Sequence, residues 1–241
     1  MVDFLRENYS LLTIFCTFIA VVSGLISYKK YKGTAAAFFI KIVLFIFIVE
    51  LIGSYSSLYD TFSFLEPIYN SYFRQNYWWY TIAFDLIVIV LFSILFQKII
   101  SNTFYKTILK YSTYAFVLFS VTYIIYHREL FFMQLFPVIE IAGAIIILGC
   151  SIFYFIELLL SDHILQFYKS VYFYIAIAIF IWWIVITPLT FYDVYMVGSD
   201  WNYIILQWEI YLSLNFMMYT TFAIGLLVSK PEKLIKLDPQ K

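Results

Sequence analysis

The segment TAAAFFIKIVLFIFIVELIGSY, residues Thr34–Tyr55, gives the clearest indication of how this chain folds. Lys41 and Glu50 are its only charged residues. As a helix with a rise of about 1.5 Å per residue, it is long enough to cross a hydrocarbon layer of about 30 Å. It shows no two-residue alternation, so it does not resemble a strand of a membrane barrel. The stretch therefore predicts a transmembrane helix.

Six more apolar runs, each closed by a charge cluster or a polar turn, surround this one. The seven predicted spans are Ser10–Tyr28, Thr34–Tyr55, Tyr77–Gln97, Ile108–Tyr126, Leu130–Leu159, Val171–Phe191 and Tyr203–Val228. Only helices and closed barrels satisfy their backbone groups in lipid. We therefore expect an all-α bundle of seven transmembrane helices, forming one transmembrane domain over residues 1–241. Pro137 lies inside the overlong fifth run, so that helix starts either at Leu130 or at Pro137.

Composition supports the same class of protein. Of 241 residues, 64% are apolar and 12% are charged, and the mean hydropathy is +0.89. These values lie outside the soluble range, and the spans leave no room for an appended soluble domain. The lipid bilayer is thus the first expected partner. Lys+Arg and Asp+Glu balance at 15 each, which argues against nucleic acid as a partner.

The distribution of Lys and Arg predicts the orientation of the bundle. Three Arg residues lie at one side: Arg6, Arg74 and Arg128. The other side holds Lys29, Lys30, Lys32, Lys98, Lys106, Lys110, Lys169, Lys230, Lys233, Lys236 and Lys241. Because cytoplasmic segments carry the excess of Lys and Arg, the amino terminus is expected outside and the carboxyl terminus in the cytoplasm.

Four carboxylates lie deep within the predicted spans: Glu50, Asp85, Glu140 and Glu209. A fifth, Glu157, lies near the cytoplasmic end of its span, where it can reach the interface. Each of the first four is five to eight residues from the outer end of its helix, which places all four about 7–12 Å below the outer surface. Four unpaired charges there would cost on the order of 10 kcal/mol. They should therefore face the bundle interior, a wet cavity or one another. A start at Pro137 would move Glu140 to the first turn of its helix and weaken the set.

All six Trp residues also belong to the predicted outer half. An aromatic belt at the headgroup level is one explanation. Trp182, Trp183 and Trp208 lie deeper than such a belt requires, and Trp208 adjoins Glu209. Aromatic faces beside carboxylates suit an organic cation or a flat apolar ligand. These three Trp side chains are the candidate walls of a pocket, and the alternative for them is core packing.

The sequence gives little support for an enzymatic function. His127 and His163 lie at opposite faces, so a His-rich metal centre is not expected. No G-x-S-x-G elbow, H-E-x-x-H motif or P-loop occurs. We assign no catalytic residue, and neither a metal nor a cofactor can be named from the sequence.

Four short segments carry a resemblance to known proteins. They are NYWWYT (Asn76–Thr81), IWWIVITPLTFYD (Ile181–Asp193), DWN (Asp200–Asn202) and QWEI (Gln207–Ile210). They resemble an uncharacterised family of seven-helix proteins from Bacteroidetes-type bacteria. The resemblance covers most of the chain and implies a multi-pass protein of the bacterial inner membrane, without implying a function.

Three functions follow from these features as hypotheses. The leading one is a membrane protein that binds a small ligand or cation in an outer-half acidic and aromatic pocket. It would act as a sensor or uptake component with a membrane partner protein. The second is a structural or assembly subunit of an envelope complex, where polar groups between helices serve packing. The third is a proton-coupled transporter of a small solute.

Overall fold

The computed structural model describes residues 2–193 and 201–231, and every regular element in them is helical. The long helices are α1 (Val2–Tyr31), α2 (Ala35–Gly53), α5 (Ile89–Ile99), α6 (Thr103–Tyr126), α7 (Pro137–Leu159), α8 (Val171–Asp193) and α9 (Trp201–Val228). Shorter pieces are η1 (Ser54–Ser57), η2 (Ser63–Leu65), α3 (Glu66–Tyr69), η3 (Tyr72–Arg74), α4 (Tyr77–Tyr80), η4 (Thr81–Val88) and η5 (Asp162–Lys169).

Seven helical segments are long and apolar enough to cross a membrane, as the sequence predicts. One of them, Tyr77–Ile99, is continuous but changes its winding: α4 leads into η4, which is a π-helix, and then into α5. π-Helical turns are rare and occur frequently at functional sites. This local change is not visible in the hydropathy pattern.

Three helix starts differ from the starts of the predicted spans by several residues. Helix α1 begins at Val2 and not at Ser10, and each of the other two starts has a visible local cause. The fifth span begins at Pro137 and not at Leu130, because proline suits the first turn of a helix, where its missing N–H is not needed. The fourth span begins at Thr103 and not at Ile108. The side chain of Asn102 accepts hydrogen bonds there from the amides of Phe104 (2.8 Å) and Tyr105 (3.4 Å), which satisfies the first turn.

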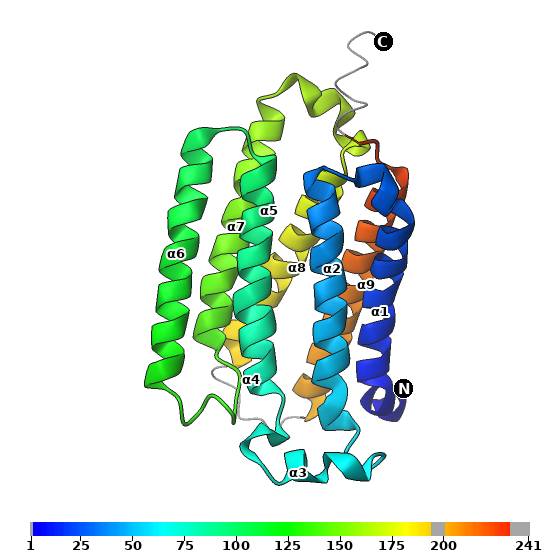
Figure 1. The fold of residues 1–241 in the computed structure, drawn as a ribbon, viewed down its shortest axis with the longest axis vertical. Coiled ribbons are helices and arrows are strands. Elements are labelled where there is room, and N and C mark those ends of the chain that lie inside the picture. The colour runs from blue at the N-terminus through cyan, green and yellow to red at the C-terminus, as the bar shows by residue number, and fades with distance from the viewer. Residues whose placement is uncertain (1, 194–200, 232–241) are drawn as a thin grey trace.

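The long helices stand side by side as a bundle (Figure 1). Helix α1 packs between α2 and α9, and α8 packs between α7 and α9. Helix α5 contacts α2, α6 and α7, while α6 lies at the edge against α5 and α7. Within the core, the Phe39 ring of α2 packs against Phe222 of α9, with ring centroids 4.9 Å apart, and against Phe92 of α5, with centroids 6.4 Å apart.

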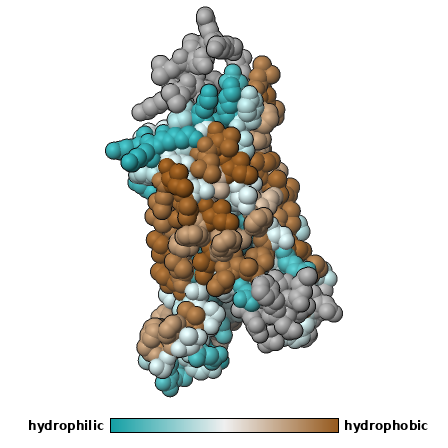
Figure 2. Space-filling view, turned by 90° about the vertical axis from the view of Figure 1, so that its right-hand side faces the viewer, coloured by the Kyte–Doolittle hydropathy of each residue, from teal (hydrophilic) through white to brown (hydrophobic). Residues whose placement is uncertain are grey.

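The surface has the pattern expected of a chain that spans a membrane. Figure 2 shows a broad hydrophobic band over the middle of one face, with hydrophilic groups gathered toward the two ends. Large apolar side chains are exposed along the helices, such as Leu118 at 71% and Ile125 at 67% on α6. In water such surface is unfavourable, whereas hydrocarbon accommodates it.

The two ends of the bundle differ in charge. The end that holds the amino terminus and residues 54–76, called here the N-terminal end, carries Arg74 and Arg128 (Figure 1). The opposite end, called here the C-terminal end, carries the described Lys residues that flank the spans. Lys233, Lys236 and Lys241 lie outside the described residues. The charge difference agrees with the sequence, and the orientation in a membrane stays a prediction.

The first helix, α1, is hydrogen-bonded to the last helix, α9, at the C-terminal end of the bundle. The last carbonyls of α9 accept hydrogen bonds from α1: Tyr31 Oη donates to Leu226 and Ser229, both at 3.1 Å, and Lys30 Nζ donates to Leu226 (3.1 Å) and Leu227 (3.0 Å). These carbonyls have no partner within their own helix. The positive charge of Lys30 also suits the negative end of the helix dipole.

Candidate functional site

The four predicted carboxylates do not form one cluster in the described part of the chain. Glu50 lines a cavity between α1, α2 and α4. Asp85 and Glu140 lie together between η4 and α7, and Glu209 is exposed on α9. The described residues contain no group of three or more His, Cys, Asp or Glu side chains that could hold a metal ion. The acidic residues therefore belong to separate candidate sites.

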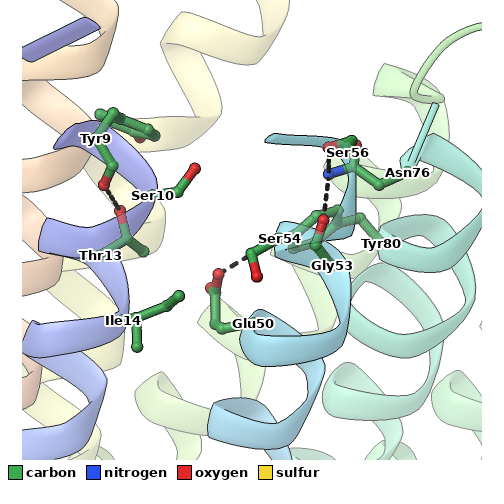
Figure 3. Close-up of a pocket in the computed structure, with 10 residues that line it drawn as sticks. All are labelled: Tyr9, Ser10, Thr13, Ile14, Glu50, Gly53, Ser54, Ser56, Asn76 and Tyr80. Carbon is green, nitrogen blue, oxygen red and sulfur yellow. Dashed lines mark hydrogen bonds between the residues drawn. The ribbon is translucent and has the colours of Figure 1, made fainter. Parts of the chain in front are cut away.

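The cavity beside Glu50 lies at the N-terminal end of the bundle (Figure 3). Its volume is about 70 Å³. Its lining comes from three elements and the turn after α2: Tyr9, Ser10, Thr13, Ile14, Glu50, Gly53, Ser54, Ser56, Asn76 and Tyr80. Apart from Ile14 and Gly53, every one of these side chains carries an oxygen. The cavity thus combines one carboxyl group with hydroxyl and amide groups.

Tyr80 holds the Glu50 side chain in place. Its phenol donates a hydrogen bond to Glu50 Oε2 at 3.1 Å. The approach depends on Gly53, because a Cβ atom at that position would lie only 2.7 Å from Tyr80 Oη and 2.8 Å from Tyr80 Cζ. Asn76 Nδ2 donates to the Gly53 carbonyl at 2.8 Å and to Ser56 Oγ at 3.0 Å, which fastens α4 to the end of α2.

Tyr9 connects the cavity to α9. Its ring stacks on Trp208 with centroids 5.6 Å apart and planes at 30°. Tyr9 also lies within electrostatic range of Glu50, as does the buried Tyr219 of α9. Trp208 therefore lies behind one wall of the cavity without being among its lining residues.

Asp85 and Glu140 form the second acidic site. Asp85 is only 8% exposed, and it lies on the π-helix η4 within electrostatic range of Glu140. Glu140 lies in the first turn of α7, the position that a start at Pro137 predicts. Its Oε1 accepts a hydrogen bond at 2.9 Å from Thr190 Oγ1 of α8. Three spans thus meet at this pair.

Trp182 and Trp183 are both buried at 5% exposure. Trp182 Nε1 donates to Asn215 Oδ1 at 2.8 Å, which joins α8 to α9. The two indoles pack edge to face at 5.0 Å, and the Trp182 ring also contacts Tyr211 at 6.1 Å and Phe84 at 6.4 Å. Neither lines the cavity beside Glu50. Both are therefore packed core residues, and the indole N–H of Trp182 has a hydrogen-bond partner.

Glu209 differs from the other three carboxylates. It is exposed on α9, on the same face as Leu206 (51% exposed) and Phe216 (54%). No hydrogen bond joins its carboxyl to the described residues. Glu157, which lies near the C-terminal end of α7, has a structural role. Its two oxygens accept from the amides of Ser101 (2.6 Å) and Asn102 (3.0 Å), just before α6 begins.

Several cavity residues were not predicted from the sequence, above all Tyr9, Asn76 and Tyr80. One signal for them exists. Gly53 follows Glu50 by about one helical turn, and a glycine inside a helical pattern often marks a close approach of another group. The hydropathy pattern alone does not say which group approaches, because it does not specify which helices are neighbours.

The chain matches no known family model, no curated protein and no solved structure. Its class therefore rests on its own fold, that of a multi-pass membrane protein built from seven apolar helices. The resemblance to a bacterial family stays a prediction.

Proposed function

We propose that this chain is a multi-pass protein of the bacterial inner membrane that binds a small monovalent cation from the outer side, at Glu50. The observation that carries the proposal is the cavity of about 70 Å³ in which one carboxyl group faces an oxygen-rich lining. Carboxylate, hydroxyl and amide oxygens are the ligands that hard cations prefer. A single carboxylate neutralises a single positive charge.

The size of the cavity restricts the ligand class. Pockets for drug-sized organic molecules are about 300–1,000 Å³, whereas a single water needs about 10–15 Å³. The cavity of about 70 Å³ therefore has room for a small cation and a few waters, but not for a large aromatic cation. Sodium, potassium and ammonium ions belong to the fitting class.

The side of access follows from the charge distribution. The cavity lies at the end of the bundle that carries Arg74 and Arg128, opposite the end with most of the described Lys residues. The positive-inside rule assigns the N-terminal end to the outer side. In this proposal the cation enters from outside. A partner protein in the membrane then either responds to the bound cation or takes part in its uptake.

The experiment measures the thermal unfolding of the protein in lipid nanodiscs. Chlorides of sodium, potassium, ammonium and choline are compared at equal ionic strength, since the methyl groups around the charge of choline keep it from the close oxygen contacts that the small cations make. A cation at 100 times its Kd stabilises the folded state by about 2.7 kcal/mol. We expect at least one small cation to raise the unfolding temperature over choline.

Two variants make the test specific. Glu50→Gln keeps an oxygen that can accept from Tyr80 but removes the charge, so the cation effect should disappear. Glu209→Gln removes a carboxyl that lies on a membrane span but outside the cavity, so this variant should retain the cation effect. If all four salts act equally on the parent protein, or if Glu50→Gln retains the effect, cation binding at Glu50 is refuted.

A second candidate function is an assembly subunit of an envelope complex. It is favoured by Glu209, whose carboxyl is exposed on an apolar helix face and therefore suits a polar or cationic group of a partner helix. An assembly subunit should show no cation-dependent stabilisation. Glu209→Gln should then reduce the size of the complex that is extracted from membranes, measured by native mass spectrometry.

A further inference from the structure

Helix α9 carries a stripe of side chains on the side that faces away from the bundle. The helix packs between α1 and α8 (Figure 1), and Trp208 and Asn215 are among the side chains that contact these two neighbours. On its outer side, residues recur at intervals of three or four, which places them on one face of a helix. This face, called here the α9 stripe, consists of Leu206, Glu209, Ser213, Phe216, Thr220 and Ile224.

Three side chains of the α9 stripe are polar, and their polar groups are unused. The Glu209 carboxyl and the hydroxyls of Ser213 and Thr220 make no hydrogen bond to a described residue. Other hydroxyls in the spans differ in this respect. Thr221 beside the stripe and the exposed Thr122 of α6 each donate to the carbonyl four residues earlier in their own helix, both at 2.8 Å. The stripe therefore presents one carboxyl and two hydroxyls to an occupant outside this chain.

The depth of these groups shows what kind of occupant they need. The span begins at Tyr203, so Glu209 lies about 9 Å and Ser213 about 15 Å from its outer end. The long Glu209 side chain can extend toward the interface, but the short side chain of Ser213 cannot. Polar groups at membrane depth face other protein groups rather than lipid, and Ser and Thr are enriched where helices meet. The α9 stripe thus has the properties of a surface that another helix covers.

We propose that the α9 stripe is the contact between two copies of this chain, which dimerise through parallel α9 helices. Copies of one chain insert into a membrane with the same orientation, so their α9 helices run parallel. A two-fold axis brings the same surface of both copies together. The intervals of three and four residues are those by which two helices pack side by side at a crossing angle of about 20°.

The polar groups of the stripe complement one another in such a pair. A carboxylate accepts hydrogen bonds, whereas a hydroxyl donates as well as accepts. Ser213 of one copy differs in depth from Glu209 of the other by one helical turn, about 6 Å, so its hydroxyl can donate to that carboxyl. The two-fold axis repeats this hydrogen bond. Because each carboxyl turns to a hydroxyl of the other copy, the two carboxyls do not have to lie in direct contact.

The dimer contact differs in chemistry from the partner helix with a cationic group considered above. The described Arg side chains of the N-terminal end, Arg74 and Arg128, lie outside the spans, so a second copy brings neither of them to the depth of Glu209. The contact between copies is therefore held by hydrogen bonds and not by an ion pair. Glu209→Gln separates the two cases, because its amide oxygen accepts from Ser213 as the carboxyl does but carries no charge for a cation.

Cysteine cross-linking of the full chain in membranes tests where the copies meet. Phe216→Cys and Leu206→Cys each place a thiol on the stripe, and the control Leu118→Cys places one on α6 at a position that is 71% exposed. Cys16 and Cys150 are buried, and the parent chain measures their background. A disulfide forms only where the two Cα atoms come within about 7 Å. After oxidation with iodine, we expect several-fold more linked dimer from each stripe variant than from the control.

Energy transfer between two differently labelled preparations in liposomes, at decreasing ratios of protein to lipid, measures the strength of the contact. Glu209→Leu keeps the bulk of the side chain but cannot hydrogen-bond, so it should weaken association several-fold. Glu209→Gln should associate like the parent protein. The control Thr122→Ala removes an exposed hydroxyl of α6 and should also associate like the parent protein.

Four results would overturn the proposal. They are a monomeric parent chain, stripe variants that cross-link no more than Leu118→Cys, an unchanged association of Glu209→Leu, and a loss of association in Glu209→Gln. A monomeric parent chain would leave the stripe to a different protein. The inference goes beyond cation binding at Glu50 and does not depend on it. A monomer whose unfolding temperature still responds to a small cation overturns the dimer alone, and a dimer without that response overturns the cation site alone.

Discussion

Gly53→Ala is expected to detach Tyr80 from Glu50 while leaving the bundle folded. The new methyl group would lie 2.7 Å from Tyr80 Oη, 2.8 Å from Cζ and 2.9 Å from Cε2, all closer than real Cβ contacts. These three atoms are the far end of a side chain that can rotate, so the ring should swing away. Overpacking costs about 1–3 kcal/mol, and replacing a helical glycine with alanine regains about 1 kcal/mol. Packing alone therefore costs about 0–2 kcal/mol. Loss of the hydrogen bond between Tyr80 and Glu50 adds about 1.5–3 kcal/mol, so the net loss of stability is about 1.5–5 kcal/mol.

The assay is a double-mutant cycle with Tyr80→Phe, measured by equilibrium unfolding in mixed micelles. Removing the phenol hydroxyl deletes the 3.1 Å hydrogen bond to Glu50. That change should cost about 1.5–3 kcal/mol in the parent protein if Glu50 is charged. In the Gly53→Ala background it should cost close to nothing, because the bond is already broken. Additive effects of the two substitutions would refute the reasoning.

Gly149→Ala is the matched control for this prediction. A Cβ at Gly149 of α7 meets no atom within 4 Å, so the substitution should be neutral or stabilise the helix by up to about 1 kcal/mol. The cation effect proposed for Glu50 should persist in this variant and weaken in Gly53→Ala.

Two further predictions concern the packing that carries the sites. Tyr31→Phe removes the hydroxyl that donates to the last carbonyls of α9, so it should destabilise the protein by about 1–3 kcal/mol in an equilibrium unfolding assay. The control Tyr126→Phe changes a side chain that is 83% exposed, and it should leave the stability unchanged in the same assay. Gly225→Ala places a methyl 2.6 Å from Cβ of Tyr174, an atom bonded directly to the backbone, so α8 and α9 have to separate. In thermal unfolding it should cost at least the upper part of the range of about 1–3 kcal/mol, which is more than the packing cost of Gly53→Ala.

The spans could be predicted from the sequence because hydropathy and length decide them. All seven predicted runs correspond to helices that are apolar and long enough to cross a membrane. Their ends depend on single residues, such as Asn102 as the cap of α6 and Pro137 at the start of α7. Hydropathy reports the apolar run and not the cap, which is why the predicted fourth start differs from the observed one and the fifth start stayed open between Leu130 and Pro137.

The sequence predicts a depth for each acidic residue, but not the direction in which its side chain points. Residue number along a helix gives depth, whereas direction depends on which face meets a neighbour. The spans are apolar on all sides, so no polar face reveals this. Glu50 faces α4, Asp85 faces α7, and Glu209 is exposed. The π-helix adds to the difficulty, because it changes the rotation per residue just where Asp85 lies.

Because the acidic residues lie apart, the bundle needs fewer counter-ions to neutralise them at any one site. Four carboxylates in one chamber would need several counter-ions. In the observed arrangement Glu50 lies apart from Asp85 and Glu140, so the cation proposed at Glu50 faces a single carboxyl group. The Glu140 carboxyl accepts a hydrogen bond from Thr190. Glu209 lies on an exposed face, where its side chain is free to extend toward the interface. Each site can therefore be titrated by itself, and Asp85→Asn should leave the cation response at Glu50 intact.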